Sequence, residues 1–231
     1  MAISINRVYQ KVLAIANKEQ RGYITPQEFN LFSDHAQMEI FEQYFYDKEQ
    51  FKRRNDEVDE LTRVKIEKFK KETLLTDNLK DRILPEDCYL VETVHTVKSN
   101  GERISVERLD RDSQYDIHAS IDSLPLLKPN ENRPVYWTRS NRRISITPNF
   151  SSASVNYIKI PTTPSWTYRI SAGSALYDPG QSGHQDFELH ESEENNLVLK
   201  ILQLAGVNLK DSALVQAAAQ SEASEIQQQK Q

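Results

Sequence analysis

The side chains that could carry out chemistry are few and widely spaced in this chain of 231 residues. His35 and Glu39 lie four residues apart, so a helix would place an imidazole and a carboxylate on one face, where they could share a metal ion. His184, Asp186 and His190 permit the same interpretation within a loop. Isolated sets of this kind are common, and a polar helix edge or a hydrogen-bonded boundary histidine is by far the more common explanation. We therefore expect no metal and no cofactor.

Other catalytic signatures are also missing from the sequence. The chain has 6 glycines, and no two are closer than Gly180 and Gly183, so it lacks a phosphate-binding loop. The segment Gly180–Gly183 also lacks the spacing of a nucleophile elbow. The single cysteine, Cys88, excludes a thiolate zinc cage and an internal disulfide framework. The sequence predicts a protein that is not an enzyme, and a hydrolase that uses His184 is the weakest alternative.

The charge is unevenly distributed along the chain. Residues 1–75 hold 13 basic and 13 acidic side chains, residues 76–170 hold 13 and 12, and the last 61 residues hold 3 and 9. The densest basic run, residues 52–54, is flanked by four acidic residues, which favours a solvated helix face over a phosphate-binding patch. The apolar runs are far shorter than the roughly 20 residues of a membrane helix, so we expect no membrane contact.

One alternative function remains open in the middle of the chain. Trp137 together with Arg139, Arg142 and Arg143 could stack bases and bind phosphates, as single-strand-binding sheets do. Strand aromatics that pack a barrel or sandwich face are the more common explanation. A nucleic-acid-binding module on these strands is therefore the alternative to the function inferred below, and salt-sensitive binding to short DNA would distinguish it.

Two helices are predicted near the N-terminus. Apolar residues at three- and four-residue spacing predict a helix from Ile5 to about Glu19. Thr25, Pro26 and Glu28 then provide an N-cap, a first-turn proline and a capping-box acceptor, so a second helix should begin there. The intramolecular core is expected to include four aromatic residues of this second helix: Phe29, Phe32, Phe41 and Phe45.

The middle of the chain reads as β-structure. Short segments rich in β-branched and aromatic residues, separated by turn residues, predict strands over 88–97, 103–106, 134–138, 144–147 and 155–160. Residues 47–75 are predicted to end a helix and then form a strand, because Val64 and Ile66 alternate with polar residues.

The C-terminal part is predicted to be a loop, a helix and a polar tail. Glycines and prolines indicate a loop over 171–187, and a helix should then end at Gly206, which suits a left-handed C-cap. The tail cannot bury enough apolar surface to stay ordered alone, so it should dock on a partner. The candidate docking residues, on the portal or a neighbouring subunit, are Leu209, Leu214, Val215 and Ile226.

These elements together predict an α+β fold. We expect a helical bundle built from N-terminal and C-terminal helices, packed beside an antiparallel β-rich middle domain. The predicted parts are N-terminal helices over 1–75, a β-rich domain over 76–170, a loop over 171–187, and a C-terminal helix with a docking tail over 188–231.

Several segments, in this order, resemble the neck proteins of tailed bacteriophages. The resemblance is carried by residues 24–30, 41–46, 84–89, 134–137, 144–148, 157–161 and 186–189, and by the helix over 197–206. The chain is similar to the tail tubular protein A class of short-tailed phages and to the ring proteins of crAss-like phages.

This resemblance implies a structural role in the virion. Such a head-to-tail adaptor would form a ring of about twelve copies below the portal protein, because heterologous contacts that close by rotation give rings. Its partners would be the portal protein and the next tail or neck component. DNA would pass through the channel without specific binding. The ring would assemble in the host cytoplasm and reside at the portal vertex of the virion.

Overall fold

We analysed a computed structural model, which describes residues 2–18, 24–54, 60–75, 81–109, 129–139 and 142–206. The chain divides into two compact units. Met1–Lys68 and Pro161–Gln231 form the first, which we call the helical unit, and Phe69–Ile160 form the second, which we call the sheet unit. The middle of the chain is therefore inserted between two segments that share one core.

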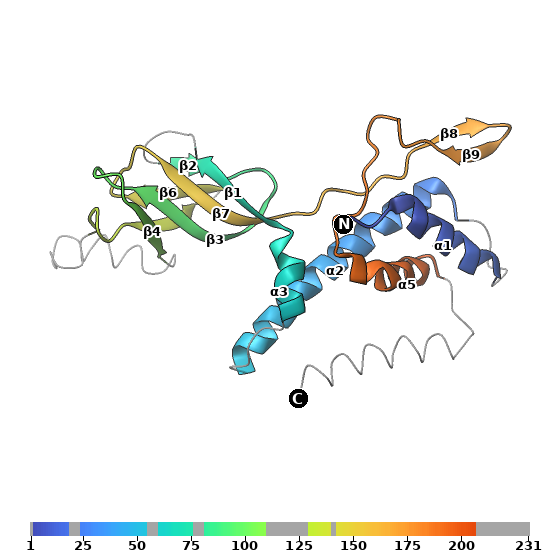
Figure 1. The fold of residues 1–231 in the computed structure, drawn as a ribbon, viewed down its shortest axis with the longest axis horizontal. Coiled ribbons are helices and arrows are strands. Elements are labelled where there is room, and N and C mark those ends of the chain that lie inside the picture. The colour runs from blue at the N-terminus through green and yellow to red at the C-terminus, as the bar shows by residue number, and fades with distance from the viewer. Residues whose placement is uncertain are drawn as a thin grey trace. The chain divides into compact units, whose positions relative to one another are not determined.

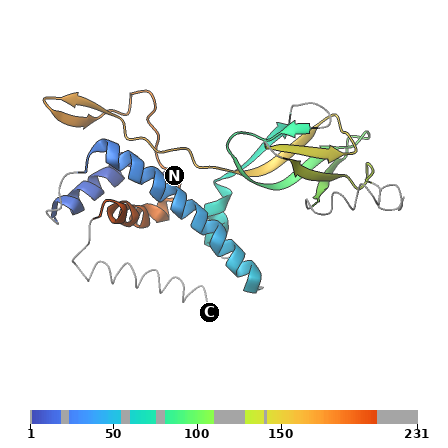
Figure 2. The ribbon, with the colours of Figure 1, turned by 180° about the vertical axis from the view of Figure 1, so that it is seen from behind.

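The helical unit contains four α-helices among its described residues: α1 (Ile5–Lys18), α2 (Pro26–Arg54), α3 (Glu60–Glu67) and α5 (Glu194–Leu204). A short 3-10 turn, η2 (Glu191–Glu193), leads into α5. α5 packs against α1 and α2, and both views show it lying along them (Figures 1 and 2). The apolar side chains of α5, including Leu197 and Ile201, are fully buried there.

The predicted capping box at the start of α2 is confirmed. The Glu28 amide donates to Thr25 Oγ1 at 3.3 Å, and the Thr25 amide donates to Glu28 Oε2 at 2.9 Å. These bonds satisfy amides that the helix itself leaves unpaired, and they hold the pKa of the Glu28 carboxyl below its usual value. Among the four predicted core aromatics, Phe29 and Phe41 are fully buried, whereas Phe32 and Phe45 are half-buried.

Two glutamates at the start of α5 hold the helices of this unit together. Glu193 is buried and accepts an ion pair from Lys65 of α3 at 2.6 Å. Burial and the nearby charge of Glu193 raise the pKa of the Tyr44 hydroxyl on α2. The next residue, Glu194, pairs with Arg7 and Lys11 of α1 at 2.9 and 2.6 Å.

The sheet unit is a seven-stranded, nearly closed, barrel-like sheet. Its strand order is β1-β7-β3-β4-β5-β6-β2, and all pairs are antiparallel except β4 with β5. The strands are β1 (Lys70–Leu75), β2 (Asp81–Ile83), β3 (Cys88–Val97), β4 (Arg103–Arg108), β5 (Val135–Arg139), β6 (Arg143–Thr147) and β7 (Ala153–Lys159). The core is built from inward-facing residues of these strands, such as Val94, Ile144 and Val155, which are fully buried.

A buried arginine joins the two edge strands of this sheet. Arg82 on β2 is 2% exposed, and its guanidinium donates to the carbonyl of Leu75 on β1 at 3.2 Å and to that of Phe150 at 2.5 Å. Burial lowers the pKa of Arg82. A side chain thus bridges the gap that backbone pairing leaves between β1 and β2.

The predicted arrangement of a terminal-helix bundle beside an antiparallel middle domain is wrong. The sheet is mixed, because β4 and β5 run parallel, with Glu107 opposite Val135. The helical unit is not a bundle of terminal helices either. It includes the long extended stretch from Pro161 onward and a two-stranded hairpin, β8 (Tyr168–Ser171) and β9 (Ser174–Tyr177).

Two local predictions also need correction. The loop expected over 171–187 contains β9 and the turn that joins it to β8. Val64 and Ile66 belong to helix α3, and the strand expected in that region begins at Lys70. The compact units divide after Lys68 and after Ile160.

Candidate interaction surfaces

The β8–β9 hairpin forms an arm of the helical unit whose end is apolar and exposed. Its strands pair only with each other in the described part of the chain. Figure 1 shows it extending beyond the segment that carries it. Ile170 is 76% exposed and Leu176 is 45% exposed. An isolated two-stranded hairpin is marginally stable in water, so an exposed apolar end favours contact with another protein.

The base of this arm is firmly anchored. Trp166 is 2% exposed and stacks on Tyr168 and Tyr177, with ring centroids 5.6 and 5.9 Å apart. Its indole donates to Asn6 of α1 at 3.1 Å, and its amide donates to Asn30 of α2 at 2.8 Å. The arm therefore starts from a fixed point on the two N-terminal helices.

The turn at the tip of the arm has a defined geometry. Ala172 and Gly173 both have positive φ, 50° and 79°. Positive φ at both central residues is the feature of type I′ turns, whose twist matches that of paired strands. The exposed end is thus an ordered two-residue hairpin rather than the open loop that its composition suggested.

A second surface lies on the outer side of α2. The six exposed side chains that define it are Glu28, Leu31, His35, Glu39, Glu42 and Tyr46. At 3.6 residues per turn they fall within an arc of about 80°. We call this set the acidic face of α2. Its two apolar members are strongly exposed, with Leu31 at 72% and Tyr46 at 63%.

The third surface is the basic turn between β5 and β6, where three predicted nucleic-acid contacts lie. Arg139 and Arg143 occupy directly opposite positions on the two strands, and Arg142 lies in the turn with a φ of 54°. All three are exposed. Like charges in such opposite positions repel, so the turn favours an anionic neighbour. Arg142 has one at 3.5 Å in Glu86, a carboxylate that is 94% exposed.

Trp137 does not behave as a base-stacking residue. It is 8% exposed, and so its indole face is not available to a base in the way that the nucleic-acid interpretation requires. A surface pocket of about 410 Å³ lies beside it, lined by Arg139 and by residues 145–149 as well as by Trp137. The basic turn thus provides exposed positive charge without an exposed aromatic platform.

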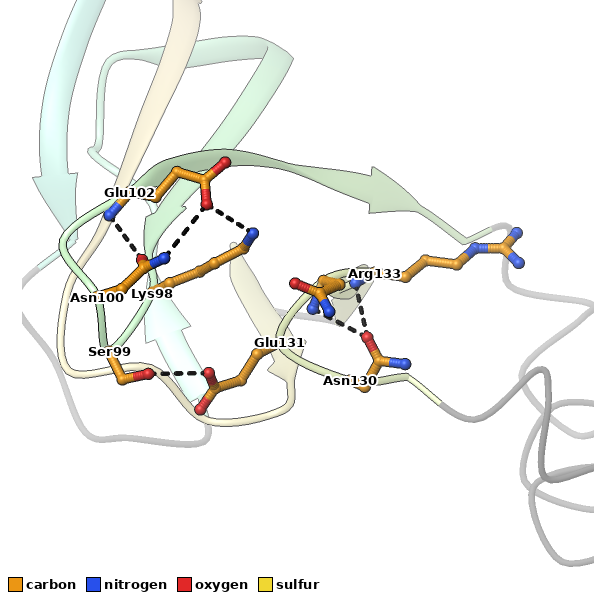
Figure 3. A network of polar contacts seen from close by, with 8 residues as sticks. Lys98, Ser99, Asn100, Glu102, Asn130, Glu131 and Arg133 are labelled. Carbon is orange, nitrogen blue, oxygen red and sulfur yellow. Dashed lines mark hydrogen bonds and ion pairs between the residues drawn. The ribbon is translucent and has the colours of Figure 1, made fainter.

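A polar network holds two neighbouring turns of the sheet unit (Figure 3). Lys98 pairs with Glu102 at 2.9 Å across the β3–β4 turn, and Ser99 Oγ donates to Glu131 at 3.0 Å. The bonds from Lys98 and Asn100 hold the pKa of Glu102 below its usual value. Glu102 is bound within its own turn and Glu131 by Ser99 of the neighbouring turn, so this cluster explains local structure rather than acid–base catalysis.

Glu39 and His184, two of the residues that suggested metal binding, have other partners in the structure. Glu39 pairs with Lys200 of α5 rather than with a metal set that includes His35. His184 Nε2 lies 3.3 Å from the Tyr177 hydroxyl and 3.9 Å from Asp186 Oδ1. Asp186 Oδ1 in turn accepts the Ile5 amide at 2.8 Å.

Two further observations bear on chemistry. His190 Nδ1 accepts the Ser192 amide at the start of η2, so its ring caps a helical turn. Within the described residues, no three His, Cys, Asp or Glu side chains come together as a metal set. Burial raises the pKa of the Cys88 thiol to about 11, so it is protonated at neutral pH.

The predicted docking residues of the tail, Leu209, Leu214, Val215 and Ile226, lie outside the described residues. No helix that the structure describes is both long and apolar enough to cross a bilayer. In comparisons with known proteins, no family model matches the chain and no curated protein matches its sequence.

Sequence reasoning missed two of the three surfaces. The arm was hidden because Gly173, Pro179, Gly180 and Gly183 suggest a loop, although Ser171-Ala172-Gly173-Ser174 between alternating residues is compatible with a two-residue hairpin turn. The acidic face could have been found from the sequence, because residues 26–46 contain four acidic and no basic side chains.

Proposed function

We propose that this protein is a structural component of a tailed-bacteriophage virion, an adaptor that forms a ring between the portal and the tail. DNA passes through the channel of this ring. The proposal rests on two observations. Several sequence segments, in their order along the chain, resemble phage neck proteins, and the structure contains the anchored arm β8–β9. An arm that exposes Ile170 and is fixed at Trp166 supports a role in assembly, because it offers a rigid apolar contact to another protein.

The test is assembly with the portal protein encoded by the same genome. The two proteins are co-expressed, and ring-on-portal complexes are counted by native mass spectrometry and electron microscopy. We expect Ile170→Asp to reduce the apparent affinity at least about tenfold, since a charge would replace an apolar anchor at a protein contact. The matched control is Leu74→Asp on β1, an aliphatic residue that is 67% exposed.

If wild type, Ile170→Asp and Leu74→Asp all bind the portal protein with the same apparent affinity, the proposed role of the arm is contradicted. Failure of the wild-type protein to associate with the portal under any condition would contradict the adaptor function itself.

A second candidate function is nucleic-acid binding by the basic turn between β5 and β6. The observation that favours it is the exposure of Arg139, Arg142 and Arg143 together. The burial of Trp137 removes its stacking component, so binding would depend on phosphate contacts and fall steeply with salt. The adaptor remains the first proposal, because the arm and the acidic face of α2 have no role in binding an anionic polymer.

A further inference from the structure

The acidic face of α2 combines two properties that single out its partner. Residues 26–46 contain Glu28, Asp34, Glu39 and Glu42 and no Lys or Arg. From Glu28 to Tyr46 the face is about 27 Å long at 1.5 Å per residue. It ends in exposed apolar side chains, Leu31 near its start and Tyr46 at its end. A partner surface that carries positive charge would complement the carboxylates of this face.

Two of the three carboxylates on this face have partners within the helical unit, and among the described residues Glu42 has none. Glu39 pairs with Lys200, and Glu28 is bound to Thr25 in the capping box. The described residues provide no ion pair for Glu42 or for Asp34. Exposed like charges along one helix face repel one another, and a basic partner would relieve this repulsion.

Two possible occupants are excluded by their charge. DNA is a polyanion and would be repelled by the face. The chain's own C-terminal segment, 207–231, carries three acidic and two basic residues, so it does not supply positive charge either.

The basic turn between β5 and β6 has the complementary charge. Most other basic side chains on the sheet unit have acidic partners of their own, as Lys70 has in Glu92 and Arg133 has in Glu107. Arg143 has no ion pair among the described residues, whereas Arg142 contacts Glu86 twice, at 3.1 Å to its carbonyl and at 3.5 Å to its exposed carboxylate. Arg143 lies opposite Arg139 on the paired strands, so positive charge is concentrated at this end of β5 and β6.

We infer that the acidic face of α2 on one copy of the protein binds the basic turn of a second copy. This inference rests on the proposed function, because a ring needs one contact between copies that repeats around it. The contact joins two different surfaces, so it is heterologous, and heterologous contacts that close by rotation give rings. Electrostatic complementarity would also set which surfaces meet and in which orientation.

The test is a charge exchange in the full chain. Glu42→Arg and Arg143→Glu are each expected to reduce the apparent affinity between copies about tenfold in low salt, because each change places like charges together. The double variant should restore it to within about threefold of wild type, because the pair is reversed but still complementary. Association is measured by sedimentation without the portal and by native mass spectrometry with it, at two salt concentrations.

Matched controls separate this contact from a general effect of charge. Glu67→Arg on α3 changes an exposed glutamate outside the face, and Arg53→Glu changes the basic run 52–54 that acidic residues flank. Neither control is expected to alter association on its own. Glu67→Arg should not restore association to Arg143→Glu, and Arg53→Glu should not restore it to Glu42→Arg. One fluorinated tryptophan resonance per unit, from Trp137 and Trp166, shows that every variant is folded.

A cross-link distinguishes a contact between copies from one within a chain. In a Cys88→Ser background, Glu42→Cys with Arg143→Cys should give a ladder of disulfide-linked multimers under oxidation. Glu67→Cys with Arg143→Cys should not. If oxidation gives only a disulfide within single chains and no linked multimers, the inference is overturned.

The remaining outcomes are also decisive. If rings form on the portal but the double variant is no better than the single ones, the inference is wrong and the proposed function stands. If no ring forms and copies do not associate, both are wrong. If Arg143→Glu abolishes salt-sensitive binding of a short DNA duplex and leaves association unchanged, the turn serves nucleic acid and the inference is overturned.

Discussion

Asp87 lies where three segments of the sheet unit meet. Its carboxylate accepts bonds from the Tyr157 hydroxyl on β7 at 2.9 Å and from Lys71 Nζ on β1 at 3.0 Å. Its carbonyl accepts the Ile160 amide at 2.7 Å. Partial burial raises the pKa of Asp87, but the bonds from Lys71 and Tyr157 outweigh it, so the pKa lies below its usual value.

This lowered pKa predicts a pH dependence of stability. A depressed folded-state pKa contributes stability above the unfolded-state pKa of about 3.9, and this stability is lost as the pH falls through the folded-state value. Asp87→Asn should therefore lower the free energy of unfolding at pH 7 by up to about 1 kcal/mol, the range of a partly exposed ion pair. The difference from wild type should shrink below about pH 4.

The measurement is urea unfolding followed by fluorine NMR of labelled tryptophan, because Trp137 reports on the sheet unit alone. Glu86→Gln is the control, since its carboxylate is 94% exposed and should show no such dependence. A constant difference between Asp87→Asn and wild type from pH 7 to pH 3 would contradict the assigned role.

At the residue scale the sequence was informative where the interaction is local. The capping box could be predicted because Thr25 and Glu28 are three residues apart and bond to each other's amides. The burial of Trp137 could not be predicted from the sequence, because β5 buries three consecutive residues, Val135 to Trp137. Strict alternation, which is the sequence signal of a strand with one exposed face, does not describe a strand covered on both sides.

At the scale of elements, the edge strands β1 and β2 depend on Arg82. One of its two bonds reaches the carbonyl of Leu75, at the other edge of the strand order. The other reaches the carbonyl of Phe150, which is 68 residues away along the chain. No periodic pattern reveals such a bridge, because an arginine in a three-residue strand reads as solvated. A sequence-based prediction could place the strands but not what closes the gap between the edges.

We predict that Arg82→Met lowers the free energy of unfolding of the sheet unit by about 2 kcal/mol. Two carbonyls would lose a charged donor, while removal of a buried charge offsets part of the cost. Urea unfolding read at Trp137 measures the change, and hydrogen exchange of β1 and β2 amides shows whether it starts at the edges. Arg108→Met, at an exposed position on β4, is the control and should cost less than about 0.5 kcal/mol. Equal stability of the two variants would count against the bridge.

The arm β8–β9 was also not predicted, because the contacts that order it join residues far apart along the chain. Its glycine-rich surroundings indicate a loop, and its short strands offer little alternation. What orders it is Trp166, which joins the arm to Asn6 and Asn30 more than 130 residues away along the chain. Contacts at that separation are invisible to local patterns.

At the scale of the whole molecule, the division into two units follows from how the chain returns. Residues from Pro161 onward rejoin the N-terminal helices, so that Glu193 and Glu194 pair with Lys65, Arg7 and Lys11. The sequence separated a helical from a β-rich region, because their apolar periods differ. It did not show that the extended stretch after 160, which leads to α5, belongs to the same compact unit as α1 and α2.

The two proposals also belong to this scale. They assign the anchored apolar arm to an apolar protein contact and the acidic helix face to a basic one. Under these proposals, the exposed apolar side chains Ile170, Leu31 and Tyr46 become covered on assembly.

The measurement that tests the central claim most directly is quantitative peptide mass spectrometry on purified particles of the phage that, under the proposed function, encodes this chain. The copy number of the protein is referenced to that of the portal protein in the same particles. An adaptor ring predicts a ratio near one to one, because each ring subunit sits below one portal subunit. Absence of the protein from intact particles would contradict the adaptor function and move nucleic-acid binding by the basic turn to the front.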